Sequence, residues 1–179
     1  GSAKTTLVSL AARLYDVTDG EVLIDGINIK DYTFDALYDK IGYVTQRAVL
    51  FSGTVRDNIN FGESSAPVSD DNTWRALDIA QATDFVEKMP GGIEAEIAQG
   101  GTNVSGGQKQ RLSIARALAR QPEILVFDDS FSALDYKTDA KLRTELNKQL
   151  KGTTLMIVAQ RIGTIRHADK IVVLDNGEA

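Results

Sequence analysis

Three short segments carry residue types that bind phosphate groups and divalent cations. Residues 1–6, Gly-Ser-Ala-Lys-Thr-Thr, supply backbone amides, a lysine for outer phosphates and a hydroxyl for Mg²⁺ at the start of an expected helix. Asp128 and Asp129 follow the apolar run 124–127, and a carboxylate at the end of a buried strand can hold Mg²⁺ beside phosphates. Ser105 precedes two glycines that let the backbone approach a ligand closely. These segments predict a site for a phosphorylated ligand with Mg²⁺.

Each segment alone also has a simpler interpretation. Residues 1–6 could be an ordinary flexible terminus, and the acidic pair could lie in a solvated loop. The Ser-Gly-Gly sequence could be a glycine turn capped by Ser105, although this does not explain the Gln-Lys-Gln-Arg run that follows it.

The elements that position these segments alternate between strand and helix. The runs 124–127 and 153–159 are apolar on both faces, which favours buried parallel strands and an α/β fold with a mostly parallel sheet. Residues 56–120 are mostly helical and interrupt the alternation. The other expected elements are helices over 5–15, 34–40, 73–89, 105–120 and 163–169, a short helix opened by Thr54, a helix carrying Leu142, Leu146 and Leu150, a hairpin over 21–30 about Asp25-Gly26, strands over 41–45 and 170–174, and a loop over 63–72.

Composition excludes several classes of protein. A chain of 179 residues can bury one sizeable core, and its content of apolar and charged residues is that of a globular domain. The absence of cysteine excludes a disulfide scaffold and a cysteine-ligated metal. The net charge of −5 weighs against nucleic acid as the partner. The apolar runs are too short for a membrane helix, which needs about 20 residues, and there is no signal peptide. Because a phosphate loop normally follows a buried strand, we expect an N-terminally truncated slice of a longer chain.

The order of the motifs resembles the nucleotide-binding domain of ABC ATPases. Residues 1–6 are similar to the end of a Walker A motif and residues 124–128 to a Walker B strand. Val104 to Gln108, Val-Ser-Gly-Gly-Gln, resembles the ABC signature. Gln46 matches the Q-loop glutamine, residues 132–135 match the D-loop, and Gln160 occupies the switch-histidine position. The resemblance covers nearly the whole chain.

The resemblance implies a P-loop NTPase core of residues 1–55 and 121–179, with residues 56–120 as an inserted α-helical subdomain that carries the signature. The segment 49–59 is similar to that of ABC exporters, where it lies against membrane coupling helices. The interval between Gln46 and Ser105 has no room for a coiled-coil arm, which disfavours the chromosome-maintenance and repair relatives.

The resemblance also assigns ATP, Mg²⁺ and roles to individual residues. Asp129 and Gln160 are the expected catalytic residues. Mg²⁺ is expected at Thr5, Asp128 and Gln46. The expected nucleotide-binding residues, of this chain or of a partner's site, are Gly1, Ser2, Ala3, Lys4, Thr5, Thr6, Gln46, Ser105, Gly106, Gly107, Gln108 and Asp135.

Two positions depart from the family pattern. Asp129 stands where the family has glutamate, and Gln160 stands where it has histidine. The pair resembles the degenerate half of heterodimeric ABC exporters, although neutral variation in an active enzyme would also explain it. Ala3 replaces the last glycine of the phosphate loop and adds a methyl group there.

The expected function is therefore ATP hydrolysis that powers export. The expected partners are transmembrane domains of the same transporter and a second nucleotide-binding domain, in a heterodimer, with no nucleic acid. The expected location is the cytoplasmic face of the cell membrane. Two alternatives remain: a regulatory ATP-binding module that hydrolyses little, and a soluble ABC protein acting on ribosomes or DNA.

Overall fold

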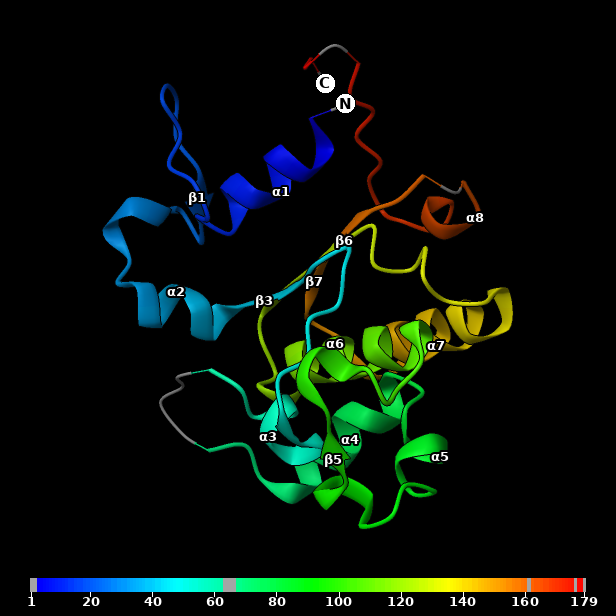
Figure 1. Cartoon of the computed structure of the whole chain (residues 1–179). Coiled ribbons are helices and arrows are strands. Elements are labelled where there is room, and N and C mark those ends of the chain that lie inside the picture. Colours follow the sequence, from blue (N-terminus) through cyan, green and yellow to red (C-terminus); the bar gives the residue numbers. More distant parts are fainter. Residues whose placement is uncertain (1–2, 63–66, 161, 176, 179) are drawn as a thin grey trace.

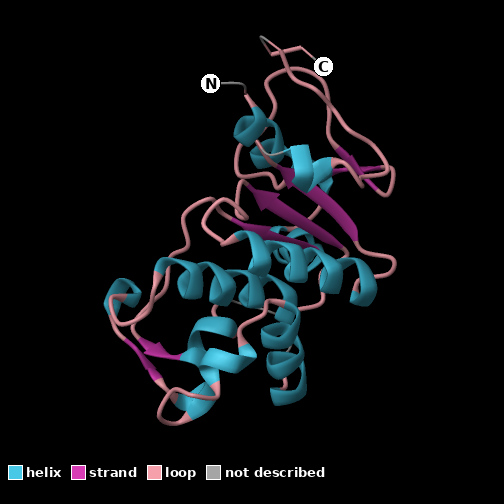
Figure 2. Cartoon of the chain, turned by 90° about the vertical axis from the view of Figure 1, so that its right-hand side faces the viewer, coloured by secondary structure: helices cyan, strands magenta, loops and turns pink. Residues whose placement is uncertain are grey.

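A parallel three-stranded sheet lies at the centre of the structure, a computed structural model that describes residues 3–62, 67–160, 162–175 and 177–178. Its order is β3 (Ile41–Val44), β6 (Ile124–Asp128) and β7 (Thr154–Val158). Ile41 pairs with Ile124, and Ile124 pairs with Thr154. The sheet lies between α1 on one side and the long helices α6 and α7 on the other (Figures 1 and 2). The α/β fold expected from the alternating pattern is confirmed.

Alternate residues of the central strand point into two different cores. Leu125 and Phe127 are fully buried against α6 (Gly106–Ala119) and α7 (Tyr136–Gln149). Val126, between them, is buried with Val8 of α1 on the opposite face. Coverage of both faces explains why this strand is apolar throughout.

The first helix is shorter than its apolar spacing predicts. α1 spans Lys4–Ala11, and the chain turns at Arg13, whose φ is +51°. The Arg13 guanidinium donates to the carbonyls of Ile29 and Tyr32, at 3.0 and 3.2 Å. These tertiary contacts stop the helix before Tyr15, so the expected boundary was wrong.

The segment between α1 and the sheet follows the turn and cap signals of the sequence. β1 (Leu23–Ile24) and β2 (Ile27–Asn28) pair antiparallel about Asp25 and Gly26, both at positive φ. This is the backbone of a type I′ hairpin turn. After a short 3₁₀ turn, η1 (Ile29–Asp31), α2 spans Phe34–Lys40 and begins at Thr33, whose hydroxyl accepts from the amide of Ala36.

The helix expected over 73–89 is two helices. α4 spans Asp70–Ile79 and α5 spans Thr83–Val86. Between them Gln81 has φ +58°, and the Ala82 amide donates to the Leu77 carbonyl, which closes α4. The periodicity was misleading because both helices bury their apolar residues in the same core. α4 also begins inside the expected loop 63–72, of which residues 63–66 lie outside the described part.

Short elements connect these helices to α6. They are β4 (Gly53–Thr54), α3 (Val55–Ile59), η2 (Gly92–Glu94), β5 (Glu96–Ile97) and η3 (Gln99–Gly101). β4 and β5 form an antiparallel ribbon at the end of the molecule remote from the sheet (Figure 2).

The C-terminal part differs from the expected elements. The helix expected over 163–169 is the shorter α8 (Ile162–Ile165). Residues 170–174 do not form the expected strand; Val173, for example, is 73% exposed. Residues 170–174 pair with no strand of a described sheet, and a strand needs such a partner to satisfy its backbone hydrogen bonds. In the described part of the chain, no helix is both long and apolar enough to cross a bilayer.

Candidate functional site

The carboxyl ends of the three strands bring the predicted polar residues to one edge of the sheet. Gln46 follows β3, Asp128 ends β6 with Asp129 directly after it, and Gln160 follows β7. Parallel strands point their carboxyl ends the same way, and open α/β sheets bind ligands at this edge. The amino end of α1 reaches the same edge, because Thr5 contacts Asp128 there.

Asp128 is held by hydroxyl groups from two other elements. Its side chain belongs to a residue only 6% exposed. The Thr5 hydroxyl of α1 donates to Asp128 Oδ1 at 2.9 Å, and the Tyr43 hydroxyl of β3 donates to Oδ2 at 3.4 Å. A buried carboxylate needs such donors to offset the loss of hydration. The phosphate-loop helix and the acidic strand are therefore joined directly.

The Tyr43 hydroxyl stays protonated and can therefore donate its hydrogen bond to Asp128. Burial is the main cause that raises the pKa of Tyr43, and the nearby negative charge of Asp128 raises it further, whereas a hydrogen bond with Ser9 acts in the opposite direction. The phenol therefore keeps its proton at neutral pH. Sequence reasoning missed Tyr43, because its position in an expected strand is typical of a tyrosine that only packs. The one feature that could have indicated it is a hydroxyl group on the strand that pairs with the strand ending at Asp128.

Asp129 receives two side-chain amides on one oxygen. Gln46 Nε2 donates to Asp129 Oδ2 at 3.1 Å, and Gln160 Nε2 donates to the same atom at 3.4 Å. The backbone of Asp129 is left-handed, with φ +50°, and its amide donates to the Val158 carbonyl at 3.0 Å. The acid and both glutamines singled out in the sequence therefore meet at one point.

Two buried polar side chains support the chain that leads to Gln46. The Ser130 hydroxyl, fully buried, donates to the Val44 carbonyl at 2.7 Å. Gln110 of α6, also buried, donates through Nε2 to the Thr45 carbonyl at 3.3 Å. Sequence reasoning missed both residues. Ser130 follows the acidic pair directly, but nothing in the sequence indicates that its partner is on β3.

The Ser-Gly-Gly-Gln segment forms the amino end of α6. Ser105 accepts from the Gln108 amide at 3.3 Å, and the Gln108 side chain accepts from the Ser105 amide at 2.8 Å. This reciprocal capping box leaves Ser105 and Gly106 exposed. α6 packs on the face of the sheet opposite to α1. The helix that this segment begins therefore lies on the other face of the sheet from α1, which carries Thr5.

Asp135 lies beside that segment at the start of α7. Its carboxylate accepts from the Thr138 hydroxyl at 2.7 Å and from the Thr138 amide at 3.0 Å. These two bonds, the hydroxyl first, hold the pKa of Asp135 below its usual range. Asp135 also attracts Arg111 of α6, whose pKa is lowered mainly by burial. A methyl group on Gly107 would lie 3.7 Å from the Ala133 carbonyl, so the two segments are adjacent.

The phosphate-loop residues are described only in part. Gly1 and Ser2 lie outside the described residues. Ala3 precedes α1 with φ +55° and ψ +5°, a left-handed conformation that an alanine adopts at a cost. Lys4 and Thr6 lie in the first turn of α1. Glycine, which the family has at this position, would adopt this left-handed conformation without strain.

Comparison with known proteins identifies the family. The family described as ABC transporter matches residues 1–132. The chain belongs to the ABC transporter family. An uncharacterized ABC transporter ATP-binding protein of Mycobacterium tuberculosis is 50% identical over 179 residues, which are 99% of this chain and 30% of that protein. A putative multidrug export ATP-binding/permease protein of Staphylococcus aureus is 46% identical over 177 residues, with the same coverage of 99% and 30%.

A solved structure agrees with this assignment. The structure of a bacterial Atm1-family ABC exporter with ATP bound matches with a TM-score of 0.90 and 36% identity. The match covers 98% of this chain and 31% of that one. The chain is therefore an ABC ATP-binding domain with the P-loop NTPase fold of an exporter, and domains of this family are ATPases. It spans about 30% of the length of the curated relatives it matches.

The donor set of the ABC domain suits ATP with Mg²⁺. Thr5 and Asp128 place a hydroxyl and a carboxylate oxygen side by side, and hard cations prefer oxygen ligands. The described residues hold no cluster of three or more histidine, cysteine or acidic side chains that could enclose a metal alone. Mg²⁺ typically uses one or two carboxylates together with phosphate oxygens, and the Thr5–Asp128 pair fits that pattern. The first turn of α1 favours the phosphate charge.

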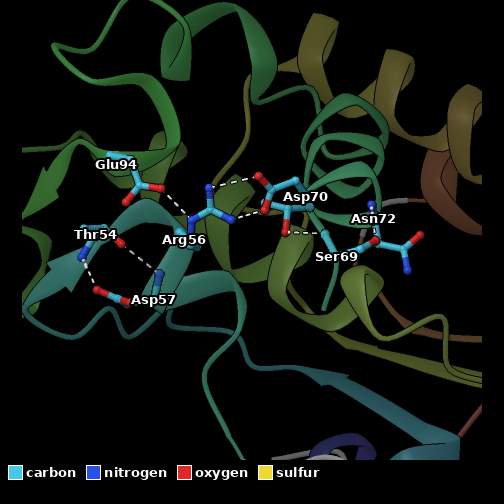
Figure 3. Close-up of polar contacts among 8 residues, drawn as sticks. Thr54, Arg56, Asp57, Ser69, Asp70, Asn72 and Glu94 are labelled. Carbon is cyan, nitrogen blue, oxygen red and sulfur yellow. Dashed lines mark hydrogen bonds and ion pairs between the residues drawn. The ribbon is translucent and has the colours of Figure 1, made fainter. Parts of the chain in front are cut away.

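The segment after Gln46 is stiffened by its own contacts. Thr54 and Asp57 form a capping box at the start of α3, with bonds of 3.0 and 2.8 Å. Arg56 lies between Glu94 and Asp70 and pairs with both, which joins α3 to η2 and α4 (Figure 3). The two acidic partners raise the pKa of Arg56, Asp70 more strongly than Glu94.

An exposed aromatic pair lies next to this segment. Phe51 and Phe61 stack with ring centroids 4.0 Å apart, and they are 40% and 50% exposed. Arg116 of α6 lies over the two rings and donates to the Asn58 carbonyl at 2.7 Å. The two rings therefore form an apolar surface that packs against the Arg116 guanidinium group.

Proposed function

We propose that this chain binds Mg-ATP at the carboxyl edge of β3, β6 and β7 and powers export by an ABC transporter. The observation that carries the proposal is the meeting of Thr5 with Asp128, and of Gln46 and Gln160 with Asp129, at that edge. The relatives support export, because they include a putative multidrug export ATP-binding/permease protein and an Atm1-family exporter.

Each residue at the edge has a proposed role. Residues 1–6 offer backbone amides to the phosphates, and Lys4 neutralises the charge of the outer phosphates. Thr5 and Asp128 hold Mg²⁺, directly or through water, with Gln46 nearby. When bound, Mg²⁺ neutralises negative charge that develops during phosphoryl transfer. Asp129 orients the attacking water, and Gln160 donates a hydrogen bond to the terminal phosphate.

Hydrolysis at this site is proposed to be slow. Aspartate is one methylene shorter than glutamate, and a displacement of about 1 Å can cost roughly 10²-fold in rate. The two amides on Asp129 Oδ2 also occupy one of the two carboxylate oxygens that could accept a proton from water. Gln160 carries no charge and cannot shuttle a proton as histidine does.

The start of α6 is proposed to complete the ATP site of a second nucleotide-binding domain. Ser105 and Gly106 are exposed there, and the capping box of Ser105 and Gln108 stabilises the amino end of α6. Gly107, Gln108 and the adjacent Asp135 belong to the same contact surface. In this division residues 56–120 form the helical subdomain, and residues 1–55 with 121–179 form the core. The partner differs from this chain, because fast hydrolysis requires a complete site somewhere in the dimer.

The membrane domains are proposed to dock beside the segment after Gln46, at the cytoplasmic face of the cell membrane. The exposed Phe51–Phe61 pair supports this, because exposed aromatic surface typically marks an interface. A pocket beside Phe51 is lined by residues of the β4–β5 ribbon and by Asn103. The ion pairs of Arg56 would pass a displacement of α3 to α4 and η2.

The decisive experiment restores the family residues. In the assembled transporter, Asp129→Glu combined with Gln160→His is expected to increase hydrolysis at this site. Changing Ser105→Ala is expected to lower total ATPase activity more than Asp129→Asn does. If Asp129→Asn alone abolishes turnover, the proposal of a slow site is wrong.

A regulatory module that binds ATP and hydrolyses little is the second candidate. The double amide contact on Asp129 favours it. Single-turnover hydrolysis in the assembled dimer separates the two: release of phosphate from this site supports a slow enzyme, and retention of intact ATP supports the regulatory module.

A further inference from the structure

Asp139 and Arg143 form a largely buried ion pair one turn apart on α7. Asp139 is only 2% exposed, and the Arg143 side chain is 20% exposed. Arg143 Nε donates to Asp139 Oδ1 at 2.9 Å, and Nη2 donates to Oδ2 at 3.4 Å. A buried carboxylate is costly unless it is paired and hydrogen-bonded. Here the forked contact fixes the plane of the guanidinium group.

The third guanidinium nitrogen reaches a different element. Arg143 Nη1 donates to the carbonyl of Gly163 at 2.7 Å. Gly163 belongs to α8, whose first residue lies two positions after Gln160. Asp139 on one side and Gly163 on the other therefore share one planar cation. Only arginine has donors arranged to serve both acceptors at once; a lysine ammonium is a point charge on a flexible stem.

The contact fixes one end of the segment that carries Gln160. The other end is fixed by β7, whose Val158 pairs with Asp128 and accepts from the Asp129 amide. Gln160 lies between these two attachments and reaches Asp129 Oδ2 at 3.4 Å. A shift of α8 along α7 would therefore move the Gln160 amide relative to Asp129.

We infer that Arg143, oriented by Asp139, is a positioning residue that holds the Gln160 segment in register with Asp129. The inference rests on the proposed function, in which Gln160 contacts the terminal phosphate of ATP. Arg143 touches neither ATP nor Asp129; it acts through the backbone of α8 and through Gln160.

The first test is hydrogen exchange in the nucleotide-free transporter. Arg143→Lys keeps the charge but loses the fork, and the amide of Ala168, which donates to the Ile165 carbonyl at the end of α8, is expected to exchange about tenfold faster. Asp139→Asn, which keeps the shape and weakens the orientation, is expected to give a smaller change in the same direction. Arg75→Lys is the matched control, because Arg75 donates to the Gln149 carbonyl at the far end of α7. Unchanged exchange in Arg143→Lys would overturn the inference.

The second test is a double-mutant cycle on ATP binding. Arg143→Lys is expected to weaken ATP binding about threefold to tenfold when Gln160 is present. In a Gln160→Ala background the same change is expected to have no further effect, because the residue it acts through is gone. Equal losses in both backgrounds would mean a general structural role and would overturn the inference.

The two tests separate this inference from the proposed function. If Gln160→Ala leaves ATP binding and hydrolysis unchanged, the role proposed for Gln160 is wrong. The exchange measurement then still decides whether Arg143 holds α8. If Gln160→Ala weakens binding but Arg143→Lys does not, the proposed function stands and the positioning role falls.

Discussion

The Thr5 hydroxyl donates to the Asp128 carboxylate at 2.9 Å, although the two residues are 123 positions apart. The bond joins the first turn of α1 to the end of β6. The oxygen atoms proposed to hold Mg²⁺ are therefore adjacent. A site organised in this way loses less freedom on binding.

Thr5→Val is expected to raise the Mg²⁺ concentration needed for half-maximal ATP binding by about tenfold. Valine keeps the shape but removes the hydroxyl and leaves Asp128 Oδ1 without its donor, and hydrogen bonds to charged groups contribute about 1.5–3 kcal/mol. Thr144→Val is the matched control, because the Thr144 hydroxyl donates to the Ala140 carbonyl of its own helix. ATP titrations at a series of Mg²⁺ concentrations measure the change. An unaltered Mg²⁺ requirement in Thr5→Val would contradict the role proposed for Thr5.

Tyr43→Phe is expected to raise the Mg²⁺ requirement by about twofold to fivefold. The bond it removes is longer, at 3.4 Å, so the effect is smaller than that of Thr5→Val. ATP binding without Mg²⁺ is expected to stay the same, because Tyr43 acts through Asp128. Tyr32→Phe is the control, because its hydroxyl donates to the Ile24 carbonyl of β1 at 3.1 Å instead of to Asp128. Equal effects of both variants, with and without Mg²⁺, would count against a specific role for Tyr43.

Local signals in the sequence predicted the elements well where short-range chemistry decides the structure. The Thr54 capping box, the Asp25-Gly26 turn and the helix after Ser105 appear as expected. Each depends on residues within a few positions of one another. The family and the α/β fold also followed, because the order of motifs along the chain contains that information.

Contacts between distant residues could not be predicted. Nothing near Gln81 indicates that the chain breaks one helix into two, since both halves share one apolar pattern. The partners of Ser130 and Gln110 are the backbone carbonyls of Val44, at the end of β3, and of Thr45, just after it, which carry no sequence signal. Residues 170–174 have strand-like composition, but composition does not supply a neighbouring strand. The roles of the site residues stay predictions.

Ala3→Gly is expected to increase the free energy of unfolding by about 0.5–1 kcal/mol. Ala3 has φ +55°, where an L-residue is strained and glycine is not, and the greater freedom of glycine in the unfolded chain offsets part of the gain. Ala12→Gly is the matched control with the opposite expected sign, because Ala12 is buried at φ −88°. Thermal unfolding of both variants provides the measurement. Loss of stability in both would show that Ala3 is not strained.

Asp57→Asn is expected to make the free energy of unfolding less dependent on pH in the acidic range. The Thr54 backbone amide, and then the Thr54 hydroxyl, lower the pKa of Asp57 below its usual value of 3.8. Because the folded-state pKa is the lower one, the stabilisation is present above the unfolded-state pKa and is lost as pH falls through the folded-state pKa. The difference between the two proteins should therefore shrink below about pH 4. Denaturant unfolding at several pH values tests this, and parallel curves throughout would refute it.

Gly42→Ala is expected to lower the free energy of unfolding by about 1–3 kcal/mol and to weaken ATP binding with it. A Cβ atom at this position of β3 would lie 2.7 Å from Leu125 Cδ2 and 2.9 Å from the Ala117 carbonyl oxygen, so either the sheet or α6 must move. Because Gln46 lies two residues after β3 and Gln110 of α6 holds the Thr45 carbonyl, either movement displaces Gln46 from Asp129. Ala12→Gly is the control, because it also lowers the free energy of unfolding but lies at the carboxyl end of α1 rather than in β3. Denaturant unfolding and ATP titration of both variants measure the two effects, and normal ATP binding in a destabilised Gly42→Ala protein would show that β3 does not position Gln46.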